Sequence, residues 1–186
     1  MIDLVLVITK TELDGVLVIE PEVFEDQRGW FMETYSFAKM KEVGICDIFV
    51  QDSHSCSEMK GTLRGLHFQN EPMAQVKLVR CSNGAILDIA VDLRRDSPSY
   101  KKWTGVIITS MNRKQLYIPA GFAHGFLTLE DHTEVQYKVD KPYSREHDRA
   151  IRYDDPDIRV QWQIANPVIS DKDADAPCLN DSDCNF

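Results

Sequence analysis

The feature that most limits how this chain can fold is a succession of short apolar runs divided by turn residues. Runs of this length, rich in β-branched and aromatic residues, are typical of β-strands. Ten of them in series with few helical segments indicate an all-β sandwich or barrel. The expected strands cover residues 16–20, 30–35, 49–55, 63–68, 76–81, 85–92, 103–108, 115–118, 123–129 and 133–139.

Turn and capping residues divide the series. Asn83-Gly84 lies between two apolar runs and is the strongest short hairpin signal in the chain. Two short segments, 36–44 and 170–177, are typical of helices. Ser36 is a candidate N-cap of the first, and Ser170 precedes the second, which Pro177 ends. The polar tail 177–186 is expected to be loose and frayed.

Size and charge narrow the class of protein. A chain of 186 residues is the size of one domain and can bury a large core without disulfides. Its net charge of -9 argues against a general role on nucleic acid or anionic membranes. The five cysteines form no CxxC pair, and the N-terminal apolar run is too short for a signal peptide or a membrane span. We therefore expect one cytoplasmic domain, residues 1–186, with reduced thiols.

Arg64 and His67 lie three residues apart in GTLRGLHFQ (61–69), which is typical of a strand. In a regular strand, side chains three apart point to opposite faces of the sheet. Gly65 lies between them, at the point where a strand could bulge. If both side chains serve one site, a bulge or twist is expected at Gly65.

Lys77 and Tyr137 occupy strand faces that are otherwise apolar. Lys77 alternates with Val79 and Cys81, and Tyr137 alternates with β-branched residues. An unpaired ammonium is costly to bury, so Lys77 is expected to reach a barrel mouth or to meet an anion. Among these residues His67 is the best general base by type, and Tyr137 is a candidate proton donor.

Other kinds of site have less support. From its strand alone, His67 could equally be a half-buried histidine bonded to the backbone. A metal-binding jelly roll often carries His-x-His, but here Gln69 stands at the second position, so no metal site is expected. His124, close to two glycines, is either a turn histidine or a ligand for phosphate or hydroxyl. GxSxG, GxGxxG and P-loop strings are missing, so hydrolysis by serine, dinucleotide binding and phosphoryl transfer lack support.

Seven strings occur in the order found in a known family. They are DQRGWFMETY (26–35), FVQDSHS (49–55), RGLHFQ (64–69), AQVKLVRC (74–81), SPSYKKWTG (97–105), IPAGFAHGF (118–126) and SDKDADAP (170–177). With these strings the chain resembles the dTDP-4-dehydrorhamnose 3,5-epimerases over nearly its whole length. The resemblance implies a cupin-type jelly-roll barrel with a few short helices, which works without a metal or any other cofactor.

The implied substrate is a dTDP-linked 4-keto-6-deoxyhexose, whose C3 and C5 would be inverted through enolate intermediates. By resemblance His67 is the base, and Asp173 is its partner, which fixes the imidazole tautomer and stabilises the imidazolium. Lys77 would stabilise the enolate electrostatically. Tyr137 would donate a proton on the opposite face of the sugar.

The resemblance also implies substrate contacts. The stretch with Arg28 and Glu33 resembles an arm that contacts substrate and could reach into a partner subunit. The other implied contacts are Gln51, Asp52 and Ser53 for the nucleotide, Arg64 and His124 for diphosphate and sugar, Tyr143 stacked on thymine, and Asp148 and Lys172. Two positions depart from the family pattern, because Ser53 stands where asparagine is frequent and Asp148 where glutamate is common.

Three alternatives stay open. A relative with the same fold could epimerise one carbon of a related dTDP-4-keto sugar, and a non-catalytic jelly roll could bind a nucleotide sugar without turnover. A metal-dependent jelly-roll oxygenase is the third. In each case we expect a homodimer, because the apolar runs 4–8 and 16–19 offer strand edges that need covering.

Overall fold

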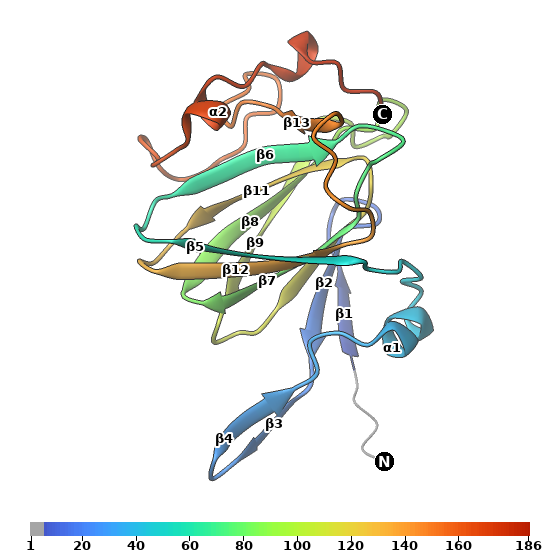
Figure 1. Ribbon diagram of the computed structural model, residues 1–186, viewed down its shortest axis with the longest axis vertical. Helices are drawn as coiled ribbons and strands as arrows, with labels where there is room; N and C mark the ends of the chain where they lie inside the picture. The colour runs from blue at the N-terminus through green and yellow to red at the C-terminus, as the bar shows by residue number, and fades with distance from the viewer. Residues whose placement is uncertain (1–5) are drawn as a thin grey trace.

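The computed structural model describes residues 6–186 and contains two antiparallel β-sheets that face each other (Figure 1). In spatial order the six-stranded sheet contains β1 (Leu6–Lys10), β2 (Leu17–Pro21), β10 (Gln115–Ile118), β7 (Lys77–Asn83), β12 (Thr133–Val139) and β5 (Gln51–Ser57). The five-stranded sheet contains β13 (Asp148–Ala150), β6 (Leu63–Gln69), β11 (Phe122–Thr128), β8 (Ala85–Asp92) and β9 (Trp103–Thr109). This arrangement agrees with the all-β sandwich predicted from the strand pattern and with the jelly roll that the family resemblance implies.

The remaining elements are small. β3 (Val23–Asp26) and β4 (Gly29–Met32) form a hairpin that projects from the body and is called the arm below. The helices are α1 (Phe37–Glu42), α2 (Asp171–Ala174) and the 3-10 turn η1 (Leu179–Asp181). Within residues 6–186, none of the helices has the length and apolar character needed to cross a membrane.

The Asn83-Gly84 turn does not close a hairpin, so this prediction is wrong. β7 belongs to the six-stranded sheet and β8 to the five-stranded sheet, and the turn carries the chain from one to the other. Gly84 has a φ of +77°, and a Cβ there would lie 2.5 Å from Oγ1 of Thr133. The local turn signal is real, but the pairing partners are decided by which strand faces must be buried together.

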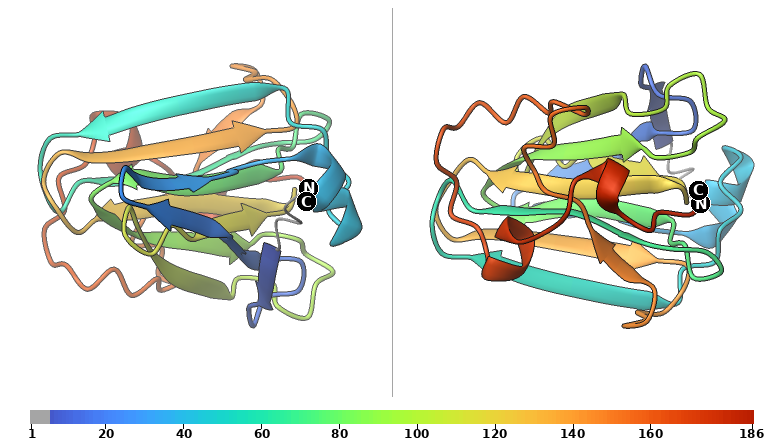
Figure 2. Two further views of the ribbon diagram at one scale, coloured as in Figure 1. Left: turned by 90° about the horizontal axis from the view of Figure 1, so that it is seen from below. Right: turned by 90° about the horizontal axis from the view of Figure 1, so that it is seen from above.

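Alternate residues of the central strands fill two apolar layers. In β8, Ile86 and Ala90 face the opposing sheet, whereas Ile89 and Val91 face outward. The outward layer is covered by the C-terminal segment, which crosses over the five-stranded sheet (Figure 2). Because both faces of β8 are buried, its sequence is an almost continuous apolar run with little alternation between apolar and polar residues.

The tail after Pro177 is ordered against the body, so the expectation of fraying is wrong. Leu179 and Cys184 are buried, and the backbone N–H of Leu179 donates to Asp155 Oδ2 at 2.7 Å. Arg149 on β13 forms an ion pair with Asp183 at 2.6 Å. The tail contains few apolar side chains, but these are enough to anchor it because the sheet beneath it has an apolar face.

The N-terminal strands differ from expectation in one respect. β2, which contains most of the run 16–19, lies between β1 and β10 and is therefore not a sheet edge. β1 is an edge strand, as expected for the run 4–8, although it was not among the ten expected strands; β3 and β13 were not predicted. Residues 4 and 5 of the predicted run 4–8 lie outside the described residues.

Candidate active site

A cavity of about 610 Å³ lies between the two sheets, on the side where residues 168–173 cross. Strands β6, β7, β11, β12 and β13 and the start of α2 contribute to its wall. Nine of the fourteen site residues expected from the sequence line it: Arg64, His67, Lys77, His124, Tyr137, Tyr143, Asp148, Lys172 and Asp173.

Arg64 and His67 reach the same cavity because β6 bulges between them. One residue of β11, Gly125, lies opposite both Gly65 and Leu66, so the register of the two strands slips by one. Gly65 has a φ of +124°, and a Cβ there would lie 2.6 Å from the Cα of Gly125. The bulge predicted at Gly65 is confirmed.

His67 is held by a buried carboxylate. Its Nε2 lies 2.6 Å from Asp173 Oδ1, and Asp173 Oδ2 accepts from the backbone N–H of Gly65 at 3.2 Å. Burial raises the pKa of Asp173, but the hydrogen bond and charge of His67 outweigh it, so the pKa lies below its usual value. An ionised carboxylate only accepts hydrogen bonds, so Nε2 carries the imidazole proton and Nδ1 is left as the basic nitrogen.

The start of α2 fixes this carboxylate in place. Ser170 is the N-cap, and its hydroxyl accepts from the backbone N–H of Asp173 at 3.2 Å. Ser170 therefore caps α2 and also orients the partner of His67.

Lys77 is a buried cation in the wall of the cavity. Its side chain is only 8% exposed, and Nζ donates to the backbone oxygen of His67 at 3.4 Å. Burial lowers the pKa of Lys77 to about 8, although the charges of Asp148 and Asp88 act in the opposite direction. Lys77 therefore lines the cavity between the sheets and is not enclosed in the apolar core.

A second histidine–carboxylate pair lies deeper. His124 Nε2 lies 2.7 Å from Oδ1 of Asp88, and both side chains are buried. Burial lowers the pKa of His124, which favours the neutral imidazole. The other oxygen of Asp88 has no hydrogen-bond partner within the described part of the chain.

Asp88 was missed from the sequence, although a signal was present. It is the carboxylate in the middle of the apolar run ILDIAVD (86–92), and a buried carboxylate requires a partner. Gln69 and Gln75 also line the cavity and were not assigned to the site.

The mouth of the cavity is polar. Asp148 Oδ2 accepts from Lys172 Nζ at 2.7 Å and from the Tyr143 hydroxyl at 3.2 Å. The hydrogen bond to Asp148 raises the pKa of Lys172. Arg64 donates to the hydroxyl of Ser57 at 3.2 Å, so its guanidinium is anchored at the rim.

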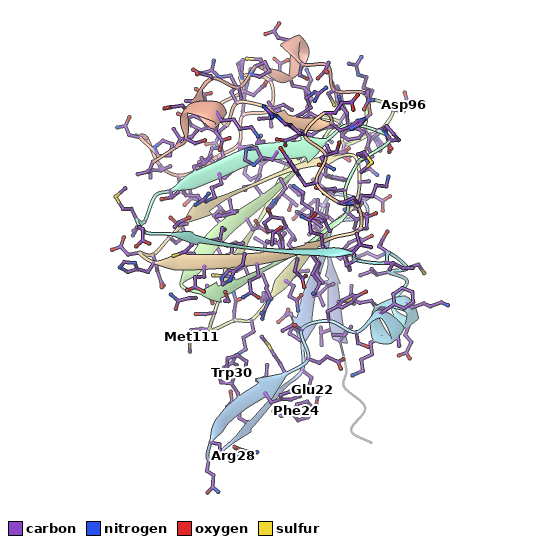
Figure 3. All side chains as sticks on the ribbon, viewed as in Figure 1. Glu22, Phe24, Arg28, Trp30, Asp96 and Met111 are labelled. Carbon is purple, nitrogen blue, oxygen red and sulfur yellow. The ribbon has the colours of Figure 1, made fainter. Side chains whose placement is uncertain are left out.

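Five expected residues do not line this cavity. Gln51 instead accepts a hydrogen bond from the backbone N–H of Tyr143 at 3.0 Å. Asp52 and Ser53 line a separate groove of about 380 Å³ next to β12. Arg28 and Glu33 belong to the arm and the chain just after it, and Arg28 points away from the body at the arm's tip (Figure 3).

Side chains that could bind a metal ion do not cluster in the described part of the chain. Across residues 6–186 there is no group of three or more His, Cys, Asp or Glu side chains that could hold a metal ion.

Known proteins are similar to this chain in both sequence and fold. The family model for dTDP-4-dehydrorhamnose 3,5-epimerase matches residues 10–181. The chain belongs to this family. The epimerase of Shigella flexneri is 48% identical over 177 residues, covering 95% of this chain and 97% of the relative.

Crystal structures of family members agree with the architecture. That of the Bacillus anthracis epimerase, with TDP and PPi bound, has a TM-score of 0.92 and 44% identity, covering 94% of this chain and 99% of that one. That of the Legionella pneumophila enzyme, in complex with dTDP-4-keto-L-rhamnose, has a TM-score of 0.92 and 41% identity, covering 96% and 95%. The cupin-type jelly roll expected for the epimerase family is confirmed.

Proposed function

We infer that this protein is a dTDP-4-dehydrorhamnose 3,5-epimerase. It converts dTDP-4-dehydro-6-deoxy-D-glucose to dTDP-4-dehydro-L-rhamnose by inverting C3 and C5. The observation that carries the mechanism is the His67–Asp173 pair, at 2.6 Å, in the same cavity as Tyr137 and Lys77. These groups are a base, a candidate acid and a cation on strands of both sheets.

The chemistry follows from the ketone at C4. Its carbonyl acidifies the hydrogens on C3 and C5, because the electron pair left behind is delocalised onto oxygen as an enolate. Nδ1 of His67 takes the proton, and Asp173 stabilises the imidazolium that forms. Lys77 faces the negative oxygen in a buried wall, where a cation stabilises developing charge more strongly than it does in water.

Inversion requires a proton from the other face of the same carbon. We assign this donor role to Tyr137, which lies on β12 in the opposite sheet from His67. The phenolate that remains and the protonated imidazole exchange protons with solvent before the second carbon reacts, and again before the next turnover. Each carbon is thus inverted with no net oxidation or reduction.

The mouth of the cavity suits a nucleoside diphosphate. Arg64 and Lys172 supply positive charge for the diphosphate, and the ring of Tyr143 offers a face on which thymine can stack. The proposed contacts Gln51, Asp52 and Ser53 lie on β5, the edge strand of the six-stranded sheet, and Gln51 bonds to the main chain of Tyr143.

Turnover in heavy water tests this function. With dTDP-4-keto-6-deoxyglucose we expect deuterium at both C3 and C5, detected by NMR or mass spectrometry. His67→Asn should bind dTDP as the wild type does and lose exchange by about 10²–10⁴-fold. Label at one carbon would instead identify a mono-epimerase, and binding without exchange would identify a non-catalytic module. Stoichiometric transition metal in the purified protein would revive the oxygenase alternative.

We further propose a homodimer in which the arm of one copy reaches the cavity of the other. Trp30 and Phe31 on the arm are exposed aromatic side chains, which favours their burial against a partner. Arg28 and Glu33 would then contact the substrate bound by the partner.

We also propose that the protein is located in the cytoplasm, which cell fractionation tests.

A further inference from the structure

The loop that carries Tyr143 is held by three glutamine side chains. This loop, residues 141–144, follows β12 and leads to β13. Gln75 Nε2 donates to the Lys141 oxygen at 2.7 Å, and Gln51 accepts from the Tyr143 N–H at 3.0 Å. Gln69 contacts the residues on either side of Tyr143.

Gln69 uses both ends of its amide on this loop. Nε2 donates to the Pro142 oxygen at 3.3 Å, and Oε1 accepts from the Ser144 N–H at 2.7 Å. The same Nε2 donates to the Met73 oxygen at 2.7 Å. One buried amide thus joins β6, the turn after it and the 141–144 loop.

Tyr143 depends on this anchoring. Its side chain is 58% exposed, and its hydroxyl donates to Asp148 at 3.2 Å. A ring so exposed gains little from packing, so its position over the cavity is set by the main chain beneath it. Gln69 lies on β6 two residues after His67, so the strand that holds the base also fixes the loop.

We propose that Gln69 is a positioning residue that orders the 141–144 loop and thereby presents Tyr143 to the nucleotide base. This role rests on the proposed function, in which Tyr143 stacks on thymine. Gln69 acts on nucleotide binding through Tyr143 and takes no part in proton transfer. An ordered loop lowers the entropic cost of binding because the stacking surface is already in place.

Gln69→Met tests the role, because methionine has a similar length and cannot hydrogen-bond to the loop. We expect KM for the dTDP-sugar, and the dissociation constant for dTDP by titration calorimetry, to rise roughly tenfold. We expect kcat and deuterium exchange at saturation to stay within about twofold, as when uniform binding alone is lost. A fall in kcat with unchanged KM would overturn the proposal.

A double-mutant cycle asks whether Gln69 acts through Tyr143. Tyr143→Ala alone should weaken dTDP binding, and adding Gln69→Met should weaken it little further, because the presented ring is already gone. Additive losses would mean that Gln69 acts by another route and would overturn the proposal. Should Gln69→Met fail to fold, Gln69→Glu keeps the acceptor for Ser144 but loses the donors, and the same cycle applies to it.

Asn70 provides a matched control. Its buried amide donates to the Asp183 oxygen at 2.9 Å and accepts from the Asn185 N–H at 3.3 Å, so it holds the tail instead of the loop. Asn70→Leu should lower Tm without changing KM for the dTDP-sugar. If Asn70→Leu raises KM as much as Gln69→Met does, the effect of Gln69→Met is a general loss of structure. If the wild-type protein fails to bind dTDP, the proposed function is refuted. If the wild type binds dTDP and the Gln69→Met variant binds it equally tightly, only the role of Gln69 is refuted.

Discussion

At the scale of single residues, the two histidines of the cavity have similar partners but different access. Each donates from Nε2 to a buried carboxylate, at 2.6 Å for His67 and 2.7 Å for His124. The side chain of His67 is 34% exposed, whereas that of His124 is 7% exposed. Only His67 is open enough to meet a substrate carbon directly, which makes it the better base.

The buried ammonium of Lys77 predicts an alkaline limit to activity. Its pKa is lowered to about 8, so the side chain is protonated below that pH and loses its charge above it. Because the cation stabilises the enolate, kcat/KM should fall as pH rises through about 8, which a pH–rate profile measures.

Lys77→Arg separates this group from any other that titrates in the same range. A guanidinium stays charged throughout, so the alkaline limb should move to a pH above 10 or disappear, even if the rate is lower. A wild-type profile that is flat to pH 9.5 would contradict the assigned role of Lys77.

At the scale of elements, the site depends on the bulge in β6. Gly65→Ala would place a Cβ 2.6 Å from Gly125 Cα and 2.8 Å from the His124 oxygen, at a φ of +124°. Neither neighbour is a flexible side-chain end, so the strands must separate. We expect a loss of at least about 2 kcal/mol of stability, or about 4–8 °C in Tm by calorimetry.

Gly29→Ala is the matched control for that variant. Gly29 has nearly the same φ, +127°, but nothing lies within 4 Å of its added Cβ. It shares the backbone strain and lacks the clash, so its loss of Tm should be clearly smaller. Equal losses would show that the close approach of β6 and β11 does not matter.

At the scale of the whole molecule, the proposed exchange of arms can be tested by mixing two inactive variants. His67→Asn removes the base, and Arg28→Ala removes the arm contact. If the arm acts on the partner's cavity, a mixed dimer contains one site with both His67 and an intact arm. Mixing should then restore about one quarter of wild-type activity at low substrate.

Arms that serve their own cavity would give no such recovery, because no site in the mixture would be complete. Sedimentation of the same samples provides the control. A monomer at micromolar concentration would contradict the dimer and remove the basis of the mixing experiment.

The sequence alone determined most of the strands, their faces and much of the cavity. Alternation placed Lys77 and Tyr137 toward the interior, and Gly65 marked the bulge that brings Arg64 beside His67. These features are local, because they follow from the two-residue period of a strand and from the φ values open to glycine. The family strings identified Asp173, which lies 106 residues after its partner and has no local signal.

Only the tertiary structure decided which strands pair and which side chains meet across the sheets. The Asn83-Gly84 turn changes sheet, the tail after Pro177 is anchored, and Asp88 meets His124 from a neighbouring strand. The hydrogen bond from Ser144 to Gln69 likewise joins residues 75 positions apart. Such contacts arise because buried apolar faces and buried polar groups need partners in the folded protein. The sequence pattern shows that a residue needs a partner, but it does not show which residue that partner is.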